Sequence, residues 1–99
     1  QYDVLLTPAL GAPPVKLGWL DMMMDDVHEY WRRIERFTPF TVWFNLTGQP
    51  AMAFPTGFSE HALPLSAQII GRPFDEATVL RAAHLYQGVT DWHKRHPAL

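Results

Sequence analysis

Two apolar runs separated by a short polar turn constrain the fold of this chain more than any other feature. Residues 51–58 and 63–70 each have the length and composition of a strand, and only four residues lie between them. So short a separation predicts an antiparallel hairpin. Pro55 cannot donate a hydrogen bond to a sheet, so the first of these strands is expected at a sheet edge or at a bulge.

The residues after the hairpin predict a helix. Asp75 occupies the position of an N-cap, and Glu76 complements the positive end of the helix dipole. Phe74 and Val79 have the spacing of a hydrophobic staple. The apolar positions form a broad surface made of Val79, Leu80, Ala82, Ala83, Leu85, Tyr86, Val89 and Trp92. We therefore expect this helix to pack on a sheet or in an interior.

The first half of the chain predicts a strand, a connection and a second helix. Residues 3–7 are expected to form a buried strand that Pro8 stops, and residues 8–18 form an extended connection. From Asp21 the pattern becomes helical, with Asp21 or Asp25 as the cap and with Pro39 ending the helix. Its apolar stripe consists of Met23, Val27, Tyr30, Ile34 and Phe37.

Residues 40–46 allow two interpretations, a strand or a short buried helix that runs into Gly48. The expected order is therefore strand, helix, short helix or strand, β-hairpin and helix. This order predicts a mixed α/β (α+β) fold in one segment.

Composition and charge exclude several classes of function. Hydrophobic residues make up 47% of the 99 residues, which excludes a disordered tail. The net charge of −2, without a run of like charges, argues against nucleic acid as a partner. The sequence has no apolar stretch of about 20 residues, so no membrane partner is expected. The absence of cysteine excludes disulfides and thiolate sites and fits a reducing cytoplasm.

No complete active site is visible in the sequence. Ser59, Glu60 and His61 are neighbours along the chain, and sequential neighbours cannot form a catalytic triad, so a polar turn is expected there. His93 and His96 beside Asp91 have the spacing of a metal site, but Pro97 ends the helix and favours a solvated basic turn. We therefore predict no catalytic residue, no metal and no cofactor.

The order of residues carries a further signal. Residues 41–58 contain Asn-Leu-Thr-Gly-Gln-Pro-Ala followed by Pro-Thr-Gly, and residues 68–76 read Gln-Ile-Ile-Gly-Arg-Pro-Phe-Asp-Glu. This arrangement resembles the C-terminal stretch of the amidase-signature family, and residues 2–8 resemble the strand that precedes it. The resemblance covers nearly the whole chain and implies a partial amidase-signature fold.

The resemblance also implies what this chain lacks. Enzymes of that family use a nucleophilic Ser, a second Ser in a cis peptide and a Lys, all in their N-terminal part. Lys16 and Lys94 do not lie in the family's Lys motif, and no Gly-Gly-Ser-Ser-Gly stretch is present. The chain also begins at Gln1 and enters an apolar run at once. We therefore expect residues 1–99 to be one C-terminal segment without the catalytic core, inactive alone.

Site residues can be assigned only through the resemblance. The candidates for the substrate-cleft wall are Thr38, Phe40, Thr41 and Trp43. The candidates for structural roles are Asn45, Gly48, Pro50, Gly57, Gly71 and Asp75. The amidotransferase branch of the family usually carries an acidic residue near the position of Thr38. Its absence here favours a free-standing amidase acting on an apolar or aromatic amide.

The expected function is thus that of a C-terminal fragment of an amidase that hydrolyses carboxamide C–N bonds. Alternatives are a non-catalytic binding or scaffold module and a split subunit of an amidotransferase-like complex. The expected partner is the missing N-terminal catalytic part. The isolated chain is also expected to form a homo-oligomer through Val4, Leu5 and Leu6 or through the helix bearing Tyr30 and Ile34, because exposed strand edges and apolar patches favour association.

Overall fold

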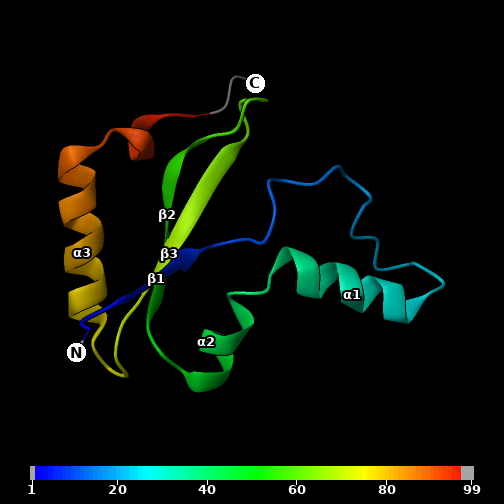
Figure 1. Ribbon diagram of the computed structural model, residues 1–99, viewed down its shortest axis with the longest axis horizontal. Helices are drawn as coiled ribbons and strands as arrows, with labels where there is room; N and C mark the ends of the chain where they lie inside the picture. The colour runs from blue at the N-terminus through cyan, green and yellow to red at the C-terminus, as the bar shows by residue number, and fades with distance from the viewer. Residues whose placement is uncertain (1, 97–99) are drawn as a thin grey trace.

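The protein is built around a three-stranded antiparallel sheet in the order β1–β3–β2, flanked by helices (Figure 1). The computed structural model describes residues 2–96. Its elements in chain order are β1 (Leu5–Pro8), α1 (Val27–Phe37), α2 (Val42–Thr47), β2 (Ala51–Phe58), β3 (Pro64–Ile70), α3 (Glu76–Val89) and the 3₁₀ helix η1 (Trp92–Lys94). The predicted mixed α/β fold and its order of elements are confirmed.

The predicted hairpin of β2 and β3 is also confirmed. Ala51 lies opposite Ile70, and the register shifts between Pro55 and Gly57. Both expectations for Pro55 are met, since β2 is an edge strand and a bulge interrupts it there. The turn is closed by Ser59, whose N–H donates to the Leu63 carbonyl at 2.8 Å.

Strand β1 pairs with β3 and forms the other edge of the sheet. It begins at Leu5 rather than at residue 3, and it includes Pro8. The apolar run alone predicted a buried strand, whereas Leu5 is 51% and Leu6 is 63% exposed, because β1 forms an edge of the sheet, as expected for the isolated chain. Within the described residues, β1 has a neighbouring strand on one side only. An apolar sequence pattern does not reveal whether a strand has one neighbouring strand or two.

Helix α3 covers one face of the sheet and forms the core with it. Val79 and Ala83 are buried, and Val79 belongs to a cluster with Phe54 and Ile69. The Phe54 and Tyr86 rings meet edge to face with centroids 4.7 Å apart. The prediction that this helix packs on a sheet is therefore confirmed.

The start of α3 was predicted correctly in one respect and wrongly in another. Asp75 is the N-cap, and its carboxylate accepts a hydrogen bond from the Thr78 N–H at 3.3 Å. The expected staple is absent, because Phe74 is 94% exposed and does not pack on Val79. The backbone at Phe74 has a φ of 65°, and this left-handed turn leaves the ring in solvent.

Helix α1 begins later than its apolar pattern suggested. Its N-cap is Asp26, whose carboxylate accepts hydrogen bonds from the N–H groups of His28 and Glu29, rather than Asp21 or Asp25. Asp21 instead accepts from the Met23 N–H at 2.9 Å, which holds this residue in a separate turn outside the helix. The end at Phe37, before Pro39, is as predicted.

Helix α1 is held by the long connection before it rather than by the sheet. The Gly11 N–H donates to the Phe37 carbonyl at 2.9 Å, and a Cβ on Gly11 would collide with the Arg36 carbonyl. Farther along, the Arg33 guanidinium donates to the Trp19 carbonyl at 2.7 Å. Figure 1 shows α1 and α2 on the side of the sheet away from α3.

The ambiguous segment after Pro39 forms a helix. Helix α2 ends at Gly48, which has a φ of 68° and whose N–H donates to the Phe44 carbonyl at 3.0 Å. The left-handed backbone suits glycine and stops the helix there. The alternative of a short helix is therefore confirmed, although no residue of α2 is buried.

The molecule exposes more surface than a self-contained domain of its size. Its accessible surface is 7746 Å². A compact monomer of 11.4 kDa exposes about 5,800 Å², so the excess is about 2,000 Å². The radius of gyration of 15.5 Å likewise exceeds the roughly 13 Å of a compact domain of this length. No helix between residues 2 and 96 is both long enough and apolar enough to span a bilayer.

Candidate functional site

The four predicted cleft residues lie together at the junction of α1 and α2. Thr38 is the C-cap of α1, and both its N–H and its hydroxyl donate to the Ile34 carbonyl, at 2.8 and 3.0 Å. Phe40 and Thr41 are half-buried, whereas Trp43 is 62% exposed. The junction therefore exposes the Trp43 ring, and the Thr38 hydroxyl proton is already used within the helix.

The turn that follows α2 is tied to the segment after β3. The Gly71 N–H donates to the Pro50 carbonyl at 2.9 Å, which extends the β2–β3 ladder by one pair. The Gln49 side-chain amide donates to the Gly71 carbonyl at 3.0 Å and accepts from the Thr47 hydroxyl at 3.1 Å. Gln49 was not among the predicted residues, and the only signal for it was a polar amide placed between Gly48 and Pro50.

Asn45 is exposed, and its side-chain amide makes no hydrogen bond within residues 2–96. The side chain that ties this turn to the backbone of Gly71 is Gln49. A structural role for Asn45 stays a prediction.

Gly71 lies at a point where three segments meet. A Cβ on this residue would lie 2.7 Å from Val79 Cγ2, 3.1 Å from the Asp75 carbonyl oxygen and 3.4 Å from Pro50 Cγ. Gly71 is also buried. This position therefore admits a backbone approach that any larger residue would obstruct.

Gly57 lies at the other end of the hairpin and is buried beneath η1. Its φ is 147°, and a Cβ there would lie 3.8 Å from the Trp92 ring. The Phe58 and Trp92 rings have centroids 6.4 Å apart, and the Arg95 guanidinium stacks over Trp92 at 4.6 Å. The 3₁₀ helix η1 therefore packs against the part of β2 that contains the bulge.

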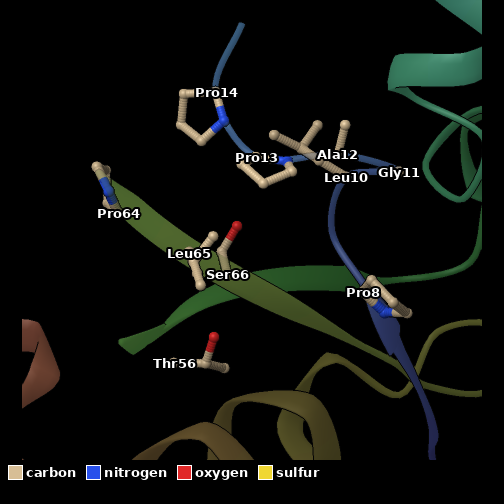
Figure 2. Close-up of a pocket in the computed structure, with 10 residues that line it drawn as sticks. All are labelled: Pro8, Leu10, Gly11, Ala12, Pro13, Pro14, Thr56, Pro64, Leu65 and Ser66. Carbon is tan, nitrogen blue, oxygen red and sulfur yellow. The ribbon is translucent and has the colours of Figure 1, made fainter. Parts of the chain in front are cut away.

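Two of the surface hollows lie beside the turn after α2 and beside the β2–β3 hairpin. One, of about 370 Å³, lies between the turn after α2 and the start of α3 and is lined by Gly48, Gln49, Pro50, Ala51, Met52, Glu76, Val79 and Leu80. A second, of about 340 Å³, lies where segment 10–14 faces the start of β3, with the hydroxyls of Thr56 and Ser66 nearby (Figure 2). Neither hollow is lined by Thr38, Phe40, Thr41 or Trp43.

The two serines lack the arrangement of a nucleophile. The Ser59 hydroxyl accepts a hydrogen bond from the Leu63 N–H at 3.2 Å, as expected for a polar turn. The His61 and Glu60 side chains lie 3.6 Å apart and are both more than three-quarters exposed. Ser66 is exposed on β3. No hydrogen bond within residues 2–96 joins either hydroxyl to a histidine or a lysine.

An ion pair between Asp91 and Arg95 holds the C-terminal turn. Asp91 accepts two hydrogen bonds from the Arg95 guanidinium, at 2.8 and 3.1 Å. The described part of the chain holds no group of three histidine, aspartate or glutamate side chains able to bind a metal.

Three carboxylates have lowered pKa values. Backbone hydrogen bonds from the Glu29 and His28 N–H groups lower the pKa of Asp26, the first of them most. A side-chain hydrogen bond from Arg33 lowers the pKa of Glu29. The Arg95 guanidinium likewise lowers the pKa of Asp91. All three carboxylates act as charged anchors of local structure, which is the opposite of a proton donor held neutral for catalysis.

Comparison with known proteins adds a relationship to this geometry. A family model described as Amidase matches residues 1–80. A glutamyl-tRNA(Gln) amidotransferase subunit of Thermodesulfovibrio yellowstonii is 42% identical over 99 residues, which are all of this chain and 19% of the relative. The subunit of the same name from Coxiella burnetii is 44% identical over 97 residues, 98% of this chain and 18% of the relative. The one from Geotalea daltonii is 41% identical, with coverage of 100% and 19%. The chain thus spans about a fifth of the length of these relatives.

Proposed function

Because the chain belongs to the amidase family, we propose that it supplies scaffold and a wall of the substrate cleft to an enzyme that hydrolyses carboxamide C–N bonds. In this proposal residues 1–99 are a C-terminal segment, and the catalytic groups come from the remainder of the protein. The chain alone is inactive.

The length of the relatives supports the proposal that the catalytic groups lie outside residues 1–99. The chain aligns over its whole length with about a fifth of each, so four-fifths of such a protein lies outside it. The excess surface of about 2,000 Å² is of the size that docking onto a larger body would cover. The expected partner, the missing catalytic part, accounts for both observations.

The chemistry of the described side chains supports the absence of catalysis. Amide hydrolysis needs a nucleophile within reach of a base, and donors aimed at the developing oxyanion. The Ser59 hydroxyl accepts a hydrogen bond from the Leu63 N–H within the hairpin turn. The neighbouring side chains of Glu60 and His61 are exposed and lie next to each other rather than next to Ser59. We therefore assign this chain no catalytic residue.

Exposure and position support the α1–α2 junction as the cleft wall. Thr38, Phe40, Thr41 and Trp43 leave a half-buried to exposed surface next to a rigid turn. That turn is fixed by the hydrogen bonds of Gln49 and Pro50 with Gly71, so Trp43 is held by a braced element rather than by a free loop. A braced aromatic surface is suited to the apolar part of an amide substrate.

A second candidate function comes from the names of the relatives. Three of them, from 41% to 44% identical, are subunits of a glutamyl-tRNA(Gln) amidotransferase. This identity favours a role within an amidotransferase, whereas Thr38 in place of an acidic residue favours a free-standing amidase. With a net charge of −2, the chain itself would leave contact with nucleic acid to other parts of such a complex.

Hydrolysis of a panel of aryl and alkyl amides by the purified chain tests whether the chain is inactive alone. We expect no turnover above buffer, and the same result for Ser59→Ala and Ser66→Ala. Turnover that either substitution abolishes would place a nucleophile in this chain and overturn the proposal. Adding the catalytic remainder in trans should then produce turnover of at least one amide.

A further inference from the structure

We propose that Gln49 is a positioning residue, which fixes the Trp43 side of the substrate cleft by joining the end of α2 to the backbone beside the core. The inference rests on the proposed function, in which the Trp43 ring contacts the apolar part of an amide substrate. Because Gln49 acts through Trp43, we expect it to affect the choice of substrate rather than the chemical step.

Helix α2 depends on the residues at its ends. It has six residues, none of which is buried within the described part of the chain, and its N-cap Thr41 makes no side-chain hydrogen bond there. So short a helix is not stable in water by its own hydrogen bonds. At its start, Pro39 lies against Gly11, where an added Cβ would come within 2.9 Å of the proline ring. The place of the Trp43 ring therefore also depends on what holds the other end.

Gln49 holds that other end with both parts of its side-chain amide. The oxygen accepts a hydrogen bond from the hydroxyl of Thr47, the last residue of α2, at 3.1 Å. The nitrogen donates to the Gly71 carbonyl at 3.0 Å. Leucine at this position would make neither bond, and glutamate would direct an acceptor at the carbonyl. The bridge therefore needs a side chain that both donates and accepts.

The bridge ends on a backbone position that the core holds in place. Gly71 is buried, and a Cβ there would lie 2.7 Å from Val79, a member of the core cluster, and 3.1 Å from the Asp75 carbonyl oxygen. The Gly71 N–H also donates to the Pro50 carbonyl at 2.9 Å, so the same residue holds the turn a second time. Gln49 thus ties α2 to the core.

The size of the effect follows from the hydrogen bond that is lost. An ordinary hydrogen bond changes an equilibrium about fivefold. Without the bond to Gly71, the fraction of molecules with α2 in its braced position falls by at most about that factor. The apparent affinity for a substrate that needs the Trp43 ring falls in proportion. We therefore expect KM for aromatic amides to rise by up to about fivefold, with kcat within a factor of about two.

Steady-state kinetics of the full-length protein that carries residues 1–99 tests the proposal with one aromatic and one small aliphatic amide. Gln49→Leu and Gln49→Glu should raise KM for the aromatic amide well beyond any change for the small one. Thr47→Val, which removes only the hydroxyl of the bridge, should have the same effect to a smaller extent. The matched control Gln87→Leu, exposed on α3, should change neither KM.

A double variant separates positioning from a general loss of structure. If Gln49 acts through Trp43, adding Gln49→Leu to Trp43→Ala should raise KM for the aromatic amide no further than Trp43→Ala does alone. Additive effects, or an equal rise in KM for both amides, would overturn the positioning role.

The same measurements distinguish this inference from the proposed function. Selective loss with Trp43→Ala but not with Gln49→Leu would overturn the inference and leave the cleft wall in place. No selectivity with Trp43→Ala, or no turnover of any amide by the full-length protein, would overturn the proposed function and the inference with it.

Discussion

The Cα of Gly71 comes so close to Val79 that a Cβ would lie 2.7 Å from the Cγ2 atom of that side chain. Gly71 follows the last residue of β3, and Val79 is in the first turn and a half of α3, so the pair sets how the helix leaves the sheet. The same glycine makes both hydrogen bonds that brace the turn after α2, because its N–H donates to the Pro50 carbonyl and its carbonyl accepts from the Gln49 side-chain amide. One backbone position thus connects the core to the element that carries Trp43.

Gly71→Ala should lower the free energy of unfolding by about 1–3 kcal/mol, because the added methyl group must displace Val79 or the Asp75 backbone. Urea denaturation measures it. The matched control is Gly88→Ala on α3, where a Cβ meets nothing within 4 Å. That substitution should stabilise the chain by up to about 1 kcal/mol. Equal stability of Gly71→Ala and the parent would show that this contact relaxes freely.

Gln49→Leu should lower the free energy of unfolding by about 1 kcal/mol, since it removes the donor to the Gly71 carbonyl at nearly constant size. Gln87→Leu, at an exposed position of α3, is the control and should have almost no effect. Chemical denaturation of both variants decides the matter. If Gln87→Leu lowered the free energy of unfolding as much as Gln49→Leu, the hydrogen bond to the Gly71 carbonyl would not account for the loss of stability.

Arg33→Ala should release the connection that precedes α1. Arg33 donates to the Trp19 carbonyl at 2.7 Å and to Glu29 at 2.9 Å, and it lies over the Trp19 ring at 5.4 Å. Limited proteolysis should then cut within residues 12–24 faster than in the parent chain. Arg32→Ala removes a 64% exposed side chain that makes surface ion pairs and one long hydrogen bond, 3.5 Å, to the His28 carbonyl within its own helix, and it should leave the cleavage rate nearly unchanged. Cleavage that Arg33→Ala does not accelerate would contradict this role.

Stability should fall on acidification below about pH 4.5. Hydrogen bonds hold the pKa values of Asp26, Glu29 and Asp91 below those of the unfolded chain. As the pH falls, the unfolded chain takes up protons first, so the contribution of these groups is complete above the ordinary glutamate value of 4.5 and is lost as the pH passes through the folded values. Urea titrations between neutral and acidic pH measure the decline, and Glu29→Gln should reduce its slope. A free energy of unfolding that rises on acidification in this window would contradict the sign.

The sequence predicted the elements that depend on residues close together in the chain. The hairpin follows from two runs and a short turn, and the Asp75 cap from one side chain and its own helix. The cap of α1 was misplaced because three aspartates near its start, Asp21, Asp25 and Asp26, offer the same chemistry. The turn made by Asp21 with Met23 excludes Asp21, and the hydrogen bonds from the His28 and Glu29 N–H groups identify Asp26 rather than Asp25 as the cap.

The remaining errors depend on contacts that a sequence pattern does not contain. Phe74 has the spacing of a staple, but the left-handed backbone at this residue points the chain elsewhere. Gln49 acts through a carbonyl 22 residues away, which no spacing rule reports. The order of residues identified the family, and the roles of Thr38, Phe40, Thr41 and Trp43 stay predictions, because no contact within residues 2–96 tests them.

The most direct measurement replaces the matching stretch of the Thermodesulfovibrio yellowstonii relative with these 99 residues and determines kcat/KM on a panel of amides. We predict that the chimera turns over amides while the relative lacking the stretch does not. Trp43→Ala in the chimera should lower kcat/KM for aromatic amides more than for small ones, with Leu46→Ala, also exposed on α2, as the control. A folded chimera without turnover, or one whose substrate preference ignores Trp43, would contradict the account.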